Sequence, residues 1–336
     1  MGDADEVGED LNDIDSQRLM IKVARLYHMH GLRQTAIARR LRISQSRVSR
    51  LLTQAEEVAI VRTVVAVPRD IYADLEEAVE ASYPVNEVHV VDAVSDNDGE
   101  LGLDLANAMA GLLNEGTLDA DIIGFTSWSK TLRQMVEALQ PIRKTTKLVI
   151  ETLGDLGPPA LQQDADRATR LFASLIGAEP VFLRTPGVLA TEQMREALLG
   201  RDQHVREALK SLDALDLVFV GIGACHIDPS LRPGDNYLTD EQFAQMRDRG
   251  AVGEVCLHFI DADGQPLKSA LDDLVVGVST DQLRAARRRW AVAGGSRKHE
   301  AIRAALTGGW VDTLVTDVAT AEYLAATASP AHQARE

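Results

Sequence analysis

The sequence predicts an α/β protein in which an N-terminal helix-turn-helix module precedes a doubly wound, mainly parallel α/β domain. Hydrophobic residues make up 45% of the 336 residues and aromatic residues only 4%, which favours a core of Ala, Val, Leu and Ile between a sheet and its helices. From about residue 87 onward, short apolar runs alternate with helical patterns. Before that point, basic residues are concentrated in one short segment, although the whole chain has a net charge of −16.

The charge pattern predicts how the chain is divided. Residues 1–15 contain seven acidic residues and no basic one, so we expect a disordered acidic tail. Residues 16–62 contain ten Arg or Lys residues against two acidic ones, which predicts a basic module whose partner is the phosphate backbone of double-stranded DNA. Residues 63–86 are predicted as a linker and a connecting helix, and residues 87–328 as the large domain.

Three helices are predicted in the basic module, at residues 16–31, 34–41 and 45–57. Gly31 is the expected end of the first helix, and Ser44 is placed to cap the third. Beyond the module, residues 60–68 are predicted as a short strand and residues 71–83 as an amphipathic helix. Three helices in so short a segment predict a helix-turn-helix.

The predicted helix 45–57 has the two faces of a recognition helix. Val48, Leu51 and Leu52 share its apolar face, whereas the opposite face is short, polar and basic, so that arginines can reach guanine or phosphate in the major groove. The alternative is a solvated basic face on an ordinary three-helix bundle. The candidate DNA-binding residues are Gln34, Thr35, Ser44, Gln45, Ser46, Arg47, Ser49 and Arg50.

Eight apolar runs predict the strands of the large domain, at residues 88–91, 121–125, 147–153, 180–183, 217–223, 275–279, 290–295 and 312–316. Their alternation with helices predicts a mainly parallel, doubly wound sheet. Several runs end in glycine before a loop or helix. Because ligands of open α/β sheets collect at the carboxyl ends of the strands, we expect a small-molecule site at that edge.

The N-terminal module resembles that of the SorC family of sugar-responsive bacterial regulators. The resemblance is carried by the run GLRQTAIARRLRISQSRVSRLLTQAEEVAIVRTVV, in which the family's Ile-Ala pair, Ile-Ser, Val-Ser-Arg-Leu-Leu and final Ile-Val recur. The sequence departs from the family at Arg42 and Ala59, where glycine is usual. We therefore expect a non-glycine residue in the left-handed conformation at the Arg42 turn.

The resemblance continues through residues 71–326 and implies a sensor domain with the fold of ribose-phosphate isomerases and glucosamine-phosphate deaminases, which binds sugar phosphates. Residues 124–132, GFTSWSKTL, are similar to the family's strand-loop-helix ending Trp-Gly-Arg-Thr-Leu. A phosphate there would meet free backbone N–H groups, two hydroxyls and the ammonium of Lys130. Lys130 stands where the family usually has arginine. A helix N-cap without a ligand is the alternative.

Three further segments carry the resemblance. Residues 220–223 resemble the family's Gly-Ile-Gly strand end, and residues 250–264 include Asp261, which could hold a sugar hydroxyl, and Asp263-Gly264, which is more simply a tight turn. Residues 293–302 resemble an Ala-Gly-Gly loop followed by a lysine, here Lys298, which would otherwise be a surface charge. The candidate effector-binding residues are Gly124, Ser129, Lys130, Thr131, Leu132, Gly221, Gly223, Asp261 and Lys298.

An enzyme is the rival class: a sugar-phosphate isomerase or deaminase with an accessory DNA-binding module. Such enzymes place a carboxylate pair, or a carboxylate and a histidine, beside the reacting carbons. Residues 221–228 offer His226 and Asp228 but no adjacent acid pair. We therefore expect a sensor with neither catalytic residues nor a cofactor.

The two cysteines, Cys225 and Cys256, are too few for a disulfide framework and predict reduced thiols. Together with His226 and His258 they could complete a zinc site, but buried cysteines and satisfied histidines are commoner, so no metal is expected. No apolar stretch of about 18 residues and no secretory signal occur, which predicts a cytoplasmic protein without a membrane partner. The family resemblance implies a homotetramer, and pairing on two half-sites requires at least a homodimer.

Overall fold

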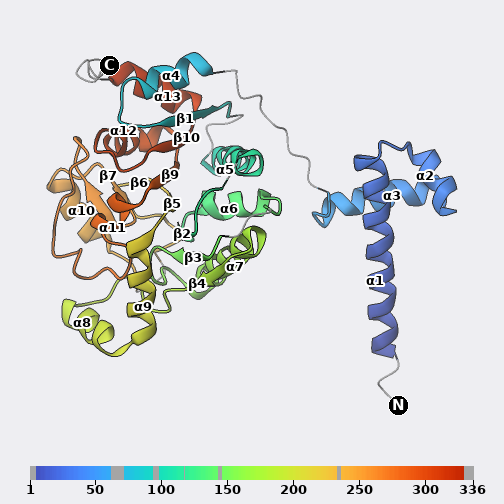
Figure 1. Ribbon diagram of the computed structural model, residues 1–336, viewed down its shortest axis with the longest axis horizontal. Coiled ribbons are helices and arrows are strands. Elements are labelled where there is room, and N and C mark those ends of the chain that lie inside the picture. Colours follow the sequence, from blue (N-terminus) through green and yellow to red (C-terminus); the bar gives the residue numbers. More distant parts are fainter. Residues whose placement is uncertain are drawn as a thin grey trace. The chain divides into compact units, whose positions relative to one another are not determined.

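The computed structural model describes residues 5–61, 72–93, 98–116, 118–142, 146–232 and 236–328. The chain divides into two compact units, residues 1–65 and 66–336 (Figure 1). No helix in the described part of the chain combines the length and the apolar character that a membrane span requires.

The N-terminal unit is a helix-turn-helix. Its helices are α1 (Asp5–Ala24), which continues through the π-helical turn η1 (Arg25–Met29), α2 (Gln34–Leu41) and α3 (Gln45–Glu57). The bounds of α2 and α3 are those predicted. The first helix begins at Asp5 instead of residue 16, so the disorder expected for the acidic tail is not found over residues 5–15.

The turn between α2 and α3 has the geometry that the sequence predicts. Arg42 ends α2 in the left-handed conformation, with φ 55°. Ser44 caps α3, since its hydroxyl accepts a hydrogen bond from the amide of Arg47 at 3.2 Å. Val48 and Leu51 of α3 pack with Ile37 of α2 in the core of the unit. The apolar face of α3 is thus buried and its polar face is left outward.

The larger unit is built on a parallel seven-stranded sheet. In spatial order its strands are β1 (Glu87–Val91), β10 (Thr313–Asp317), β9 (Arg288–Val292), β5 (Leu217–Val220), β2 (Ile122–Phe125), β3 (Leu148–Glu151) and β4 (Glu179–Val181). Every neighbouring pair is parallel. Seven of the eight predicted runs supply these strands.

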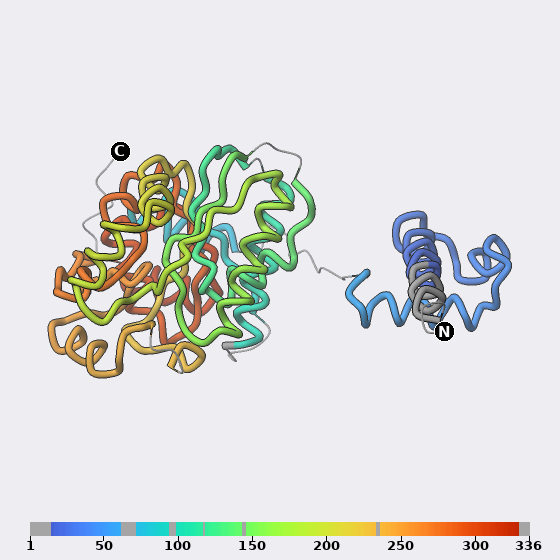
Figure 2. Tube along the Cα trace, turned by 90° about the horizontal axis from the view of Figure 1, so that it is seen from below, coloured from blue at the N-terminus to red at the C-terminus, as the bar shows by residue number. Residues whose placement is uncertain are grey.

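Helices cover both faces of the sheet (Figures 1 and 2). One face packs against α5 (Asp98–Glu115), α6 (Lys130–Ala138) and α7 (Pro159–Ile176). The other face packs against α4 (Ala73–Glu80), α10 (Asp240–Asp248), α11 (Thr280–Ala285), α12 (His299–Thr307) and α13 (Val318–Thr327). Helices α8 (Glu192–Arg201) and α9 (Gln203–Ser211) follow β4. Burial of both faces explains the continuous apolar strand sequences.

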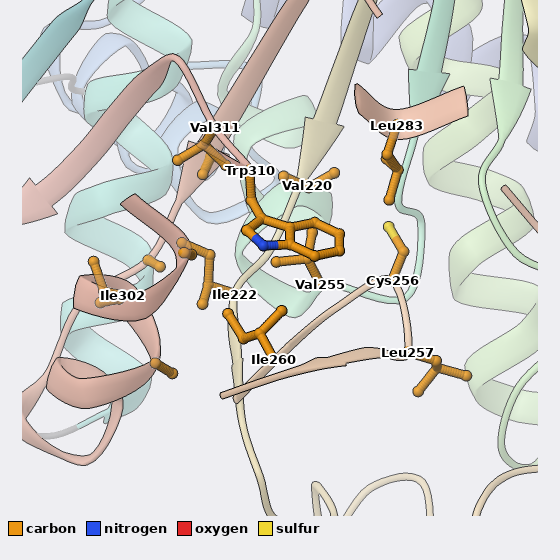
Figure 3. Close-up of a cluster of buried hydrophobic side chains, with 14 of the residues drawn as sticks. Val220, Ile222, Val255, Cys256, Leu257, Ile260, Leu283, Ile302, Trp310 and Val311 are labelled. Atoms are coloured by element: carbon orange, nitrogen blue, oxygen red, sulfur yellow. The ribbon is translucent and has the colours of Figure 1, made fainter. Parts of the chain in front are cut away.

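A small antiparallel sheet was not predicted. It consists of β6 (Gly223–Ala224), β7 (Gly253–Val255) and β8 (His258–Ile260). The turn between β7 and β8 is left-handed at both Cys256 and Leu257, with φ 52° and 64°. Figure 3 shows these residues in the same buried cluster as Trp310. Most residues of this sheet belong to segments whose sequence does not show the apolar pattern of a strand.

Two predicted elements differ in the structure. Residues 275–279 form no regular strand but make isolated bridges to Leu153 and Val188, because this segment runs beyond the carboxyl edge of the main sheet. The predicted strand 60–68 lies outside the described residues except for its first two. The predicted connecting helix is α4, which belongs to the larger unit and packs on β1 and α13.

Helix α4 is attached to β1 by two carboxylates. Glu80 accepts a hydrogen bond from the amide of Val88 at 2.7 Å, and Glu76 accepts one from the amide of Val90 at 2.8 Å. Val79 of the same helix is fully buried. The large domain therefore includes residues before position 87, where the sequence placed its start.

Candidate functional site

The candidate DNA-binding residues lie at the start of α2, at the N-cap of α3 and on the outward face of α3. Thr35 and the six candidates from Ser44 to Arg50 are exposed, and Gln34 is half-buried. The first turn of α3 contains no acidic residue. Within the described residues, neither Arg47 nor Arg50 takes part in an ion pair. Ser44 differs from the others because its hydroxyl is used by the helix cap and by Ser46, 3.0 Å away.

The second candidate site lies where the connections of the sheet change direction. From β2 the chain proceeds through β3 to β4, whereas from β5 it proceeds through β9 to β10 on the other side. The loops that follow β2 and β5 therefore diverge, and at such a point of an open sheet a ligand site is expected between the strand ends, a place called the crevice below. Gly221, just after β5, faces Ser129, since a Cβ at Gly221 would lie 3.4 Å from the Ser129 hydroxyl.

The loop Thr126–Ser129, called the effector loop below because the sequence predicts effector-binding residues beside it, is fixed from several sides. Ser129 caps α6, since its hydroxyl accepts a hydrogen bond from the Leu132 amide at 3.3 Å. The guanidinium of Arg133 donates to the carbonyls of Ser127 and Trp128 at 3.0 and 2.9 Å. The hydroxyl of Thr126 lies 2.9 Å from that of Thr152. The loop is thus held by its own backbone carbonyls and hydroxyls.

The four other candidate residues near this loop lie in different environments. The side chain of Lys130 is exposed at the start of α6. Thr131 instead faces α5, because its hydroxyl would lie 3.4 Å from a Cβ on Gly102. Leu132 is fully buried, so only its amide takes part in the loop, through the cap. Gly124 lies within β2, where a Cβ would press on Val218 and on its neighbours, so it serves packing rather than ligand access.

A half-buried glutamate, Glu254, and a lysine, Lys298, lie on the other side of the crevice. The side chain of Glu254 occupies the space that a Cβ on Gly223 would need. Its Oε2 accepts a hydrogen bond from the Leu257 amide at 2.7 Å and thereby supports the left-handed turn. Burial raises the pKa of Glu254, while the Leu257 amide and the ammonium of Lys298 lower it. The sequence analysis did not single out Glu254, although it lies in the matched segment 250–264.

Lys298 lies in this crevice at the start of α12. Burial lowers its pKa, and the carboxylates of Glu254 and Asp228 act in the opposite direction. The side chain is half-buried, and among the described residues its ammonium has no hydrogen bond or ion pair. The preceding loop is held in place because the amide of Gly295 donates to Asp317 at 2.8 Å. Lys298 is thus not an ordinary surface charge.

Asp261 lies apart from these residues. Its carboxylate accepts hydrogen bonds from the amides of Asp263 and Gln265 at 3.0 and 2.8 Å, so it closes a turn after β8. That turn packs on the C-terminal end of α12, where Gly264 meets the backbone of Gly308. Lys298 precedes the opposite end of the same helix. The structure therefore brings together Ser129, Gly221, Gly223 and Lys298, but not Asp261.

The cysteines and histidines have separate surroundings. The Cys225 thiol faces the carbonyl of Phe243 and its burial raises its pKa to about 11, while burial raises the pKa of the Cys256 thiol to about 12. His258 contacts the carbonyl of Val278 at 2.8 Å, and His226 is exposed. Over the described ranges, no three His, Cys, Asp or Glu side chains are grouped so as to hold a metal ion.

Comparison with known proteins places this architecture in context. A family model described as "Putative sugar-binding domain" matches residues 70–326. The deoxyribonucleoside regulator of Bacillus subtilis (strain 168) is 30% identical over 312 residues, which cover 93% of this chain and 98% of the relative. The sorbitol operon regulator of Klebsiella pneumoniae is 28% identical over 323 residues, covering 94% and 99%. These relatives are named as regulators rather than as enzymes.

A solved structure extends the comparison to both units. The crystal structure of the full-length sorbitol operon regulator SorC from Klebsiella pneumoniae aligns with a TM-score of 0.69 at 26% sequence identity. The alignment covers 92% of this chain and 98% of that one. The similarity therefore spans the helix-turn-helix as well as the α/β unit.

Proposed function

This chain belongs to the SorC-type family of sugar-binding transcriptional regulators, and we propose that its helix α3 binds operator DNA. We further propose that a phosphorylated sugar binds in the crevice and changes the affinity of the protein for the operator. The effector must bind more tightly to one of two states, DNA-competent or incompetent, for the operator affinity to change. We further propose that the protein acts in the cytoplasm as a homodimer or homotetramer, because two half-sites supply the specificity that one helix-turn-helix lacks.

The observation that carries this proposal is the ammonium of Lys298. Among the described residues this half-buried ammonium makes no hydrogen bond or ion pair, although the charges of Glu254 and Asp228 act on it, so a bound anion would offset the cost of its burial. Across the crevice, the amides of Lys130 and Thr131 at the start of α6 donate to no hydrogen bond within the described residues. A helix N-terminus with free amides favours a phosphate, and the exposed ammonium of Lys130 adds charge. The sugar itself would lie against Gly221 and Gly223, where no side chain intervenes.

A binding measurement tests this assignment. Calorimetry on the full-length protein would compare candidate sugars with their phosphates. Lys130→Ala and Lys298→Ala should each weaken binding of the phosphate more than binding of the free sugar, because each removes a charge-assisted contact. Lys210→Ala, on the exposed surface of α9, is the matched control and should change neither. Equal affinity for a sugar and its phosphate, unaffected by both lysine variants, would show that the crevice takes a neutral ligand.

A further inference from the structure

A single buried carboxylate connects three elements beside the effector loop. Glu151, the last residue of β3, is 1% exposed. Its Oε1 accepts hydrogen bonds from the hydroxyl of Ser127 at 3.2 Å and from that of Thr169 in α7 at 3.1 Å. Its Oε2 accepts one from the amide of Leu183, beyond β4, at 3.3 Å. Ser127 belongs to the effector loop, so the carboxylate is tied directly to that loop.

The charged groups that face Glu151 leave it without an ion-pair partner. Arg184, following β4, is paired with Asp166 of α7 at 2.6 Å, and Asp155 of the loop after β3 also faces Arg184. Within the described residues, Glu151 takes part in no ion pair. Burial and the charge of Asp166 raise the pKa of Glu151 to about 7, although Thr169, Arg184 and the Leu183 amide act in the opposite direction. Both protonation states are therefore populated near neutrality.

The surroundings of Glu151 can accommodate either protonation state. When it is ionised, the hydroxyls of Ser127 and Thr169 both donate to Oε1. When it is protonated, the carboxyl becomes a donor, and a neighbouring hydroxyl must accept from it. Thr169 can then direct its proton to the carbonyl of Ala165, which lies 3.0 Å away. Protonation thus needs no unsatisfied group, and it removes a negative charge next to the effector loop.

We propose that Glu151 makes the anion affinity of the effector loop depend on pH, an inference that rests on the function proposed above for that loop. The ionised carboxylate opposes a second anion on the neighbouring loop, and the neutral form does not. By linkage, an anion bound to the loop favours the protonated form, so its affinity rises as the pH falls through the titration of Glu151. A regulator with this device responds to its effector and to pH together.

Sulfate is a suitable probe because it is a tetrahedral dianion that does not titrate near neutrality. Calorimetry on the full-length protein should show sulfate binding at about pH 6 tighter by about threefold or more than at about pH 8. Glu151→Gln should show a clearly smaller ratio of the two affinities, because it lacks the carboxylate that titrates next to the loop. Glu179→Gln, an exposed acid on the neighbouring strand β4, is the matched control and should keep the wild-type ratio.

A second variant tests the proposal without altering Glu151. Asp166→Asn should free Arg184 to stabilise the ionised carboxylate, so the midpoint of the pH profile should move to lower pH. A merely structural role of Glu151 would not move this midpoint. The proposal is overturned if Glu151→Gln keeps the wild-type ratio, or if it folds poorly and Asp166→Asn leaves the midpoint in place.

Lys130→Ala separates this inference from the function on which it rests. If Lys130→Ala loses sulfate binding while Glu151→Gln keeps the wild-type pH dependence, the anion site stands and the role of Glu151 fails. If the wild-type protein binds no sulfate at either pH, the anion site and the role of Glu151 fail together.

Discussion

Arg42 adopts a left-handed backbone conformation at the end of α2, with φ 55°, and its side chain is exposed. A residue with a Cβ pays about 1 kcal/mol for this conformation, and glycine does not. Arg42→Gly should therefore raise the free energy of unfolding of the N-terminal unit by about 1 kcal/mol, measured by urea denaturation. Arg40→Gly, at an exposed position inside α2, is the control and should lower it by a similar amount. Equal destabilisation by both variants would contradict the argument.

Gly223 and Glu254 provide a second test at the scale of single residues. A methyl group at position 223 would displace the Glu254 carboxylate from the crevice. Gly223→Ala should therefore destabilise the protein in the wild-type background but much less when combined with Glu254→Ala. A double-mutant cycle in denaturant should give a coupling energy of about 1 kcal/mol or more. Additive effects would mean that the two positions do not compete for the same space.

The chemistry of single residues limited what the sequence could tell about the crevice. In the sequence, Gly221 and Gly124 are both simply glycines at or near the end of a strand. In the structure, Gly221 leaves space in the crevice, whereas Gly124 leaves space for the side chain of Val218. Asp261 could serve a ligand or its own turn, and only the two amides that reach its carboxylate decide between them. Glu254 could not be found because its position depends on the turn beyond it.

At the scale of elements, we expect the side chains of α3 to recognise the bases of the operator DNA. Arg47→Ala and Arg50→Ala should each weaken operator binding by about 1–3 kcal/mol if either contacts a base, without unfolding the protein. Arg18→Ala, on the exposed surface of α1, provides the control for loss of one positive charge. Gel shifts at fixed salt concentration measure the effect. Full operator affinity in the Arg47, Arg50 double variant would rule out α3 as the recognition helix.

Elements with a strong local signal were predicted well. The bounds of α2 and α3 follow from their helical period, the turn at Arg42 and the Ser44 cap of α3, all of which are local. The hairpin β7–β8 was missed because its turn uses Cys256 and Leu257 where glycine or asparagine is usual. Residues 275–279 have the composition of a strand, but their bridges depend on loops distant in sequence. The elements that could not be predicted from the sequence are therefore those whose formation depends on contacts between residues distant in the chain.

At the scale of the whole molecule, the uneven charge predicts how DNA binding depends on salt. The basic segment 16–62 belongs to a chain whose net charge is −16, so attraction to DNA must come from a few local contacts. Operator affinity should fall by at least about tenfold when the salt concentration rises fourfold. Fluorescence anisotropy with a labelled operator measures this dependence. An affinity that does not change with salt would exclude phosphate contacts as its main source.

The two carboxylates of α4, on Glu76 and Glu80, affect whether folded molecules aggregate through the edges of their sheets. Strand β1 is an edge of the sheet, and Glu76 and Glu80 occupy amides that would otherwise face outward. Strand β4, at the other edge, is short and contains Pro180, which has no N–H to offer. Neither edge is thus an open template for a strand from another molecule. A variant with both glutamates replaced by alanine should form β-rich aggregates during concentration, detectable by light scattering, that the native chain resists.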